Sequence, residues 1–265
     1  MSLLPFFFII LMGAALGLAG GGGSVLTVPI LVYGFHISAT IATGYSLFLV
    51  GSTSLFGTII YGFQKKIAWK KGLLFSIPSI FSIFITRNFL VPIIPQNILV
   101  FDSFKLSKDL LILMIFAFTM LFSAYSMIKI KSETEVDLVD KVNITEVILK
   151  SLLIGVLSGI IGAGGGFLIV PVLIFLIGLD IKTAAATSLF VITLNSLIGF
   201  TAVVGQIQIQ WNLLMQLLVL ALFGNLLGII LNKYIKPENL KKGFGYLIGL
   251  VAIMIIFQEL THFSH

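Results

Sequence analysis

Long apolar segments fill almost the whole of this 265-residue chain, and they decide what it can fold into. Hydrophobic residues make up 58% of the chain and charged residues 10%, against roughly 25% charged in an ordinary soluble domain. Polar surface is too scarce to cover a water-soluble globule, so lipid must be the solvent for much of the chain. The apolar segments lie near residues 3–35, 39–61, 72–94, 110–128, 147–177, 184–204, 213–231 and 246–260.

The length of these segments predicts an all-α polytopic membrane protein. At about 20 residues per crossing, the chain has room for about 8–10 membrane passages and for no sizeable soluble domain. The absence of cysteine excludes disulfides, thiolate metal sites and cysteine nucleophiles.

The chain repeats itself at an offset of 142 residues. Residues 11–69 align without a gap on residues 153–211, and 20 of the 59 positions are identical. The shared positions include Pro29 and Pro171, the triplets at 46–48 and 188–190, and the two tryptophans, Trp69 and Trp211. We therefore expect a first membrane repeat at 1–128, a cytoplasmic linker at 129–144, where the chain is most polar, and a second membrane repeat at 145–265.

Charge decides how the repeats are oriented. The loop at 64–71 carries four lysines, whereas its mate at 206–213 carries no charge. If each long glycine-interrupted run adds a passage or a re-entrant pair, thirteen of the sixteen basic residues fall on one side. The positive-inside rule favours that arrangement. The sequence thus predicts inverted repeats in the plasma (inner) membrane, with the basic loops in the cytoplasm and both termini outside.

Two glycine runs interrupt apolar segments at matching places in the two halves. The first, GLAGGGGSVLTVP at 17–29, contains Gly21, Gly22, Gly23 and Ser24, and its mate, GIIGAGGGFLIVP at 159–171, contains Gly164, Gly165 and Gly166. Consecutive glycines disfavour a helix, and the freed amides must face protein, water or a ligand. Paired broken helices in inverted halves indicate a transporter's binding site, where the positive end of a half-helix attracts an anion. The alternative is that these glycines only permit close helix packing.

Small polar residues follow each break and form a matched stripe. Their hydroxyls and carboxamide could donate hydrogen bonds to an oxyanion, or could simply join helices. Arg87 is the one basic residue inside an apolar run; it could hold an anion bidentately or extend its head to the membrane surface. The candidate substrate-binding residues in this group are Thr43, Ser46, Thr53, Arg87, Thr187, Ser188 and Asn195.

Other kinds of site are missing from the sequence. No acid lies deep in an apolar run, which disfavours a carboxylate proton relay. We find no metal-ligand cluster, nucleophile triad or phosphate loop, and GLAGGGGS has no βαβ context that would make it a nucleotide motif. We expect neither an enzyme nor a metal, cofactor or nucleic-acid partner. The expected partners are a small anionic substrate and the lipid bilayer, and the sequence leaves a homo-oligomer open.

At these motifs the chain resembles the sulfite exporter TauE/SafE family of bacterial membrane transporters. The two glycine-run motifs, the downstream ATGYSLF and AATSLF, and the ends QKKIAW and QIQIQW carry the resemblance, which spans almost the whole chain. It implies transport of sulfite, sulfoacetate or other organosulfonates. Alternating access at a midplane site between the repeats is the mechanism we expect; an anion channel or a carrier for small organic carboxylates is the alternative. Thr187-Ser188 is closer to the family's usual threonine-serine pair than Tyr45-Ser46, so the halves need not contribute equally.

Overall fold

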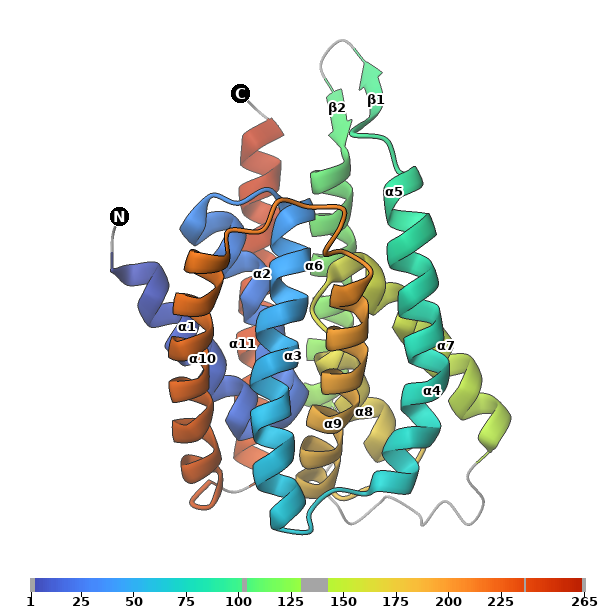
Figure 1. Cartoon of the computed structure of the whole chain (residues 1–265), viewed down its shortest axis with the longest axis vertical. Coiled ribbons are helices and arrows are strands. Elements are labelled where there is room, and N and C mark those ends of the chain that lie inside the picture. Colours follow the sequence, from blue (N-terminus) through green and yellow to red (C-terminus); the bar gives the residue numbers. More distant parts are fainter. Residues whose placement is uncertain (1–2, 102–103, 130–142, 236, 264–265) are drawn as a thin grey trace.

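The chain folds into a bundle of helices whose boundaries recur between its two halves (Figure 1). The computed structural model describes residues 3–101, 104–129, 143–235 and 237–263. The first half contains α1 (Leu4–Ala19), the 3₁₀ segment η1 (Gly20–Leu26), α2 (Thr27–Pro29), the π-helical η2 (Ile30–Gly34), α3 (Ala39–Phe63), α4 (Trp69–Ile85), the π-helical η3 (Thr86–Leu90), α5 (Val91–Ile93), strands β1 (Asn97–Phe101) and β2 (Phe104–Ser107), and α6 (Lys108–Lys129). The second half contains α7 (Ile144–Ile161), α8 (Gly166–Phe175), α9 (Ile181–Thr201), α10 (Trp211–Asn232) and α11 (Pro237–Phe263).

The expected all-α membrane architecture is confirmed. Seven helical segments among the described residues are long and apolar enough to cross a membrane, and Gly166–Phe175 and Gly245–Glu259 form shorter apolar helices. Large apolar side chains cover the outside of the bundle; Phe81, Phe122 and Phe257 are each about two-thirds exposed. Lipid can accommodate such a surface, whereas water would penalise it. Most of the expected linker at 129–144 lies outside the described residues.

One small β-hairpin departs from the helical pattern. β1 and β2 pair antiparallel, with Val100 opposite Lys105 and Phe101 opposite Phe104. The hairpin stands at the upper end of Figure 1, between α5 and α6. The residues 142 positions later belong to α11, so this hairpin has no counterpart in the second half.

The first apolar run is a bent hairpin and not one straight helix. Gly20 has a φ of +64°, which ends α1. Beyond Gly20 the chain turns back along α1. The contact between Phe6 and Phe35 shows this reversal: their rings lie 5.2 Å apart, edge to face. In the second half α7 ends at Gly162, with a φ of +75°, and α8 turns back in the same way. Both glycine runs therefore break their helices, as the sequence predicts.

Corresponding helices in the two halves run in opposite directions in Figure 1. α3 descends and α4 rises, whereas α9 rises and α10 descends. The start of each helix recurs at the 142-residue offset: Ala39 and Ile181 begin α3 and α9, and the two tryptophans begin α4 and α10.

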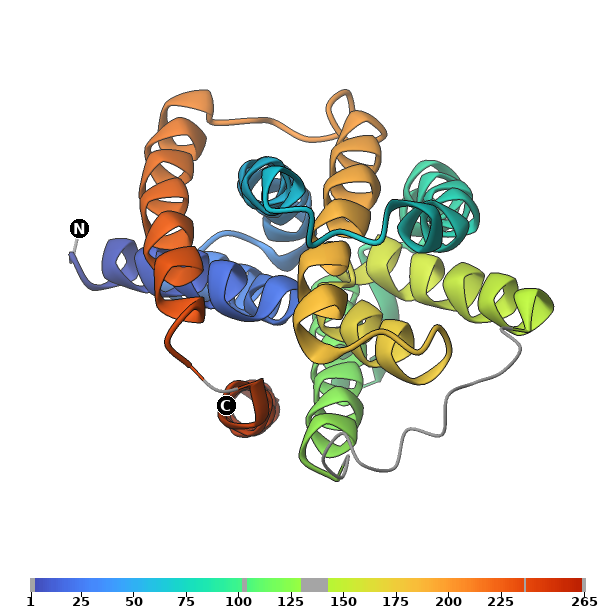
Figure 2. The same cartoon turned by 90° about the horizontal axis from the view of Figure 1, so that it is seen from below.

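The contacts between helices also follow the repeat. α1 packs mainly on α10 and α4 mainly on α7, while α3 packs on α9 and α6 on α11. Swapping the two halves converts the first pair into the second and leaves the last two unchanged. Single atoms follow the same rule. A Cβ on Gly13 would overlap the carbonyl oxygen of Ala221, and one on its mate Gly155 would overlap that of Ser79, the mate of Ala221. Figure 2 shows α3 and α9 side by side between α10 and α4.

Candidate functional site

The two glycine breaks meet at the centre of the molecule. Gly21 lies so close to Gly166 that a Cβ on either residue would overlap backbone atoms of the other. This approach requires glycine on both sides, because any larger residue would separate η1 from α8. The candidate site is thus built from the two breaks together, although they are far apart in the sequence.

A hydrogen bond from Gly21 to Ser188 connects the first break to α9. The N–H of Gly21 donates to Oγ of Ser188 at 3.1 Å, and that hydroxyl donates to the carbonyl of Ala185 at 2.7 Å. Its mate Ser46 is also fully buried, but its hydroxyl has no hydrogen-bond partner. The repeated triplet therefore has one serine with a structural contact and one with a free donor.

The second break contains more glycines with positive φ angles than the first. Gly164 and Gly165 have φ values of +65° and +69°, which β-carbon-bearing residues rarely adopt. Gly165 caps the ten-residue helix α8, whose positive dipole end points into the centre of the bundle. In the first half, η1, α2 and η2 are each seven residues or shorter and of three different helix types. The two breaks therefore differ in backbone geometry, and only the second leads directly into a helix of ten residues.

Arg87 places a buried guanidinium beside the second break. It is 2% exposed, and a Cβ on Gly162 would overlap both its Nη2 and the side chain of Thr43. Nη1 donates to Oγ1 of Thr43 at 3.1 Å, while Nε and Nη2 have no hydrogen-bond partner. Among the described residues no carboxylate forms an ion pair with Arg87; the ion pair found there joins Lys150 to Glu146. Arg87 points inward in this structure and does not extend to the membrane surface.

The other candidate residues divide into bonded and free groups. Ser24 donates to the carbonyl of Gly21 at 2.7 Å, and Oγ1 of Thr187 accepts from the N–H of Ala68 at 3.0 Å. These hydroxyls stabilise the break and the start of α4. Thr53 is buried without a partner for its hydroxyl. Asn195 accepts from Ser79 at 2.9 Å and leaves its amide nitrogen unpaired. Gly22 and Gly23 are buried inside η1.

Two buried serines near the second break were not singled out from the sequence. Oγ of Ser158 and Oγ of Ser196 lack hydrogen-bond partners. A Cβ on Gly165 would lie 3.1 Å from the first, and a Cβ on Gly164 would overlap the second. Ser196 is the mate of Ser54, which also has a buried free hydroxyl, so the repeat could have pointed to it. Ser158 has Leu16 as its mate, so no repeat signal exists for it.

Comparison with known proteins agrees with this architecture. The family described as "Sulfite exporter TauE/SafE" matches residues 5–255. The chain belongs to the TauE/SafE family. A "Probable membrane transporter protein" of Xylella fastidiosa (strain 9a5c) is 27% identical over 252 residues, which cover 94% of this chain and 92% of the relative. Relatives with the same description from Methanocaldococcus jannaschii and Bacillus subtilis (strain 168) are 28% and 22% identical; each alignment covers 96% of this chain, and 96% and 98% of the relatives. No solved structure matches the chain.

The site of this TauE/SafE protein offers hydrogen-bond donors and one positive charge. No group of three His, Cys, Asp or Glu residues suited to a metal ion occurs among the residues that the structure describes. The groups that lie at the second break are the hydroxyls of Thr43, Ser158 and Ser196, the guanidinium of Arg87 and the N-terminus of α8. All of them can donate to an oxyanion or carry positive charge. The arrangement can therefore bind a small anion.

Proposed function

We propose that this protein is a secondary transporter of small anions, chiefly sulfur-containing ones such as sulfite, sulfoacetate or other organosulfonates. The observation that carries the proposal is the uncompensated guanidinium of Arg87 beside the second glycine break. A buried cation is costly unless it is paired. An anionic substrate would supply the missing charge, and the planar guanidinium suits the oxygen atoms of a sulfonate or sulfite group.

A set of free donors would surround such an anion. The unpaired Ser46 lies three residues after Thr43, so the two share one face of α3. The hydroxyl of Thr43 already donates to the carbonyl of Thr40 and accepts from Arg87, so Thr43 orients the guanidinium and does not add a free donor. Ser158 and Ser196 approach the same break from α7 and α9. Substrate binding would give partners to the buried hydroxyls of Ser46, Ser158 and Ser196, which offsets part of the free-energy cost of their desolvation.

The same arrangement supports inverted repeats and alternating access. The opposite directions of α3 and α9 and the exchanged pairs, α1 with α10 and α4 with α7, support a two-fold relation between the halves. In such transporters one repeat moves against the other around a site at the midplane. The lysine-bearing loop between α3 and α4 lies at the lower end of Figure 1, and we place that end in the cytoplasm of a plasma-membrane protein.

The membrane potential favours export of the proposed substrates. An inside-negative membrane drives a monoanion outward with about 2.3 kcal/mol per 100 mV. Facilitated export then needs no coupled ion.

A flux assay in liposomes tests this proposal. Purified protein is reconstituted in vesicles loaded with sulfite, sulfoacetate or acetate, and efflux is followed at an imposed inside-negative potential. We expect saturable efflux of a sulfur anion that increases with the potential. Efflux that rises linearly with concentration would indicate a channel, and efflux of acetate alone would indicate a carboxylate carrier; either result contradicts the proposal, as does no flux.

A further inference from the structure

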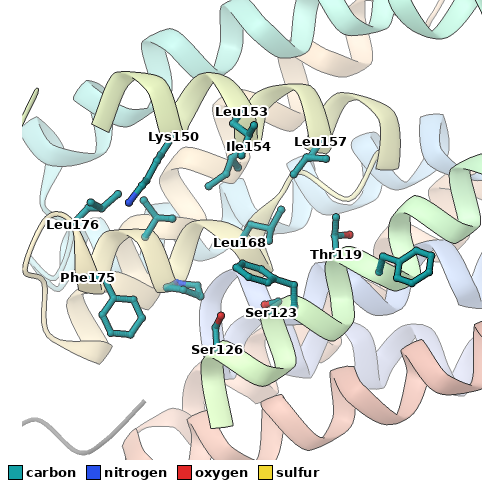
Figure 3. Close-up of a pocket in the computed structure, with 14 residues that line it drawn as sticks. Thr119, Ser123, Ser126, Lys150, Leu153, Ile154, Leu157, Leu168, Phe175 and Leu176 are labelled. Atoms are coloured by element: carbon teal, nitrogen blue, oxygen red, sulfur yellow. The ribbon is translucent and has the colours of Figure 1, made fainter. Parts of the chain in front are cut away.

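A second feature of the molecule lies away from the glycine breaks. A groove of about 530 Å³ runs between α6, α7 and α8, and Figure 3 shows the side chains that line it. Its walls are almost entirely apolar and include Phe118 and Phe122 from α6, Leu153 and Leu157 from α7, and Leu168 and Val172 from α8. Phe118, Phe122 and Leu153 are each more than 60% exposed, so the groove opens on the outer surface of the bundle.

Two of the three hydroxyls in this groove are already bonded to the protein, and Ser126 is the third. Thr119 donates to the carbonyl of Phe116 at 2.7 Å, and Ser123 donates to that of Phe167 at 2.8 Å. An aqueous route for an anion would need free donors along its walls. The groove instead suits a hydrocarbon chain, which gains from burial of apolar surface and needs no hydrogen bonds.

One end of the groove carries two opposite charges in a defined order. Lys150 lines the groove beside Leu176, at the end where α8 finishes (Figure 3). Glu146 lies one helical turn earlier on α7, farther from the centre of the bundle, and accepts from Lys150 Nζ at 2.6 Å. Both side chains are nearly half exposed. An exposed pair at this spacing contributes little stability, so a ligand can readily replace it.

We propose that the groove binds one phospholipid with an ethanolamine headgroup. The acyl chain lies along Leu157 and Leu153, the phosphate binds Lys150, and the ammonium group binds Glu146. The order of chemical groups along the lipid, from chain to phosphate to amine, matches the order of residues along α7. Lys150 and Glu146 are about 6 Å apart along the helix axis, a span that the short ethanolamine arm can bridge.

The two charges also distinguish among headgroups. A glycerol headgroup offers no cation to Glu146, and the carboxylate then repels the nearby phosphate. A choline headgroup carries a cation without N–H donors, so it cannot hydrogen-bond to the carboxylate. Basic residues between helices at a membrane surface are a known form of lipid recognition, and the acidic partner adds the selectivity for ethanolamine here.

The first repeat has no equivalent site. The mates of Lys150 and Glu146 are Phe8 and Leu4, which carry no charge. The mate of Phe175 is Tyr33, whose hydroxyl donates to Glu259 at 2.8 Å and ties η2 to α11. The inference therefore concerns a single lipid per chain, and it stands independently of the transport proposal.

Native mass spectrometry of the full-length protein tests the inference. Delipidated protein in detergent is mixed with phosphatidylethanolamine, phosphatidylglycerol or phosphatidylcholine carrying identical oleoyl chains. We expect one ethanolamine lipid to be retained, with at least about tenfold preference over the other two. Lys150→Ala should abolish retention, and Glu146→Gln should shift the preference toward phosphatidylglycerol. Lys70→Ala, which changes an exposed lysine at the start of α4, is the matched control and should behave like the wild type.

Several results would overturn the inference. Equal retention of all three lipids would show that only the acyl chain is recognised. A wild-type preference in Glu146→Gln would remove the role of the carboxylate. Retention of no lipid, or a dimer that dissociates in Leu153→Glu, would show that the groove is empty or covered by a second copy of the chain.

Discussion

Arg87 donates a hydrogen bond to Thr43 across 3.1 Å, and this contact joins two helices of the first repeat beside the glycine break of the second. The break itself supplies Gly162, against which both side chains pack. The candidate anion site is therefore shared between the repeats. Any movement of one repeat against the other would change the distance between the guanidinium and the N-terminus of α8, which suits a site that must bind and release.

Replacing Arg87 should separate function from stability. Arg87→Met removes a buried charge that has no ion pair among the described residues, so the variant avoids the cost of burying an unpaired cation. Transport should fall, because loss of one partner of a buried charged contact costs about 2–5 kcal/mol in binding. We expect at least a tenfold loss of sulfur-anion flux and an unchanged or higher melting temperature in detergent. Retained flux, or a marked loss of stability, would show that Arg87 has a structural role.

The paired serines should respond differently to the same change. Ser188→Ala leaves the buried N–H of Gly21 without its acceptor, which should destabilise the protein by about 1–3 kcal/mol. Ser46→Ala removes a hydroxyl that has no partner, so stability should be unchanged while the apparent affinity for the anion falls. Thermal unfolding and concentration-dependent flux of both variants make the comparison. Equal destabilisation by the two changes would contradict the unequal roles inferred for the halves.

The second glycine break should not tolerate a side chain. Gly165→Leu places a Cβ 3.0 Å from Ser158 and forces a φ of +69° that costs about 1–2 kcal/mol for an L-residue. Gly178→Leu is the matched control, because Gly178 has a φ of +63° and no atom near its Cβ position. We expect Gly165→Leu to reach the membrane without transport activity and Gly178→Leu to keep its activity. Loss of transport in both variants would indicate backbone strain and not the site.

The sequence was sufficient to predict the helical architecture and the places where helices break. The identity of Gly20 with Gly162, and of the prolines that follow, marks both breaks because consecutive glycines cannot hold a helix in lipid. Arg87 was also identifiable, since a basic residue inside an apolar run is costly and needs a reason.

Tertiary contacts decided what the pattern alone could not. Ser46 and Ser188 occupy the same position in the repeated triplet, yet only Ser188 accepts from the amide of Gly21. That outcome depends on the contact between Gly21 and Gly166, which comes from how the halves pack. The hairpin of β1 and β2 was not predicted, because its strands of five and four residues are short and lie between two long apolar runs. The roles of the candidate binding residues stay predictions until the variants are measured.

The orientation of the repeats can be tested with introduced cysteines, because the sequence contains none of its own. Gln64 and Gln206 are mates at the 142-residue offset, and both are exposed in loops, the first between α3 and α4 and the second between α9 and α10. These loops lie at opposite ends of the bundle in Figure 1. In intact cells, a membrane-impermeant maleimide should label Gln206→Cys but should reach Gln64→Cys only after the membrane is permeabilised. Labelling of both from one side would mean that the repeats are parallel, and the reverse pattern would place the lysine-rich end outside.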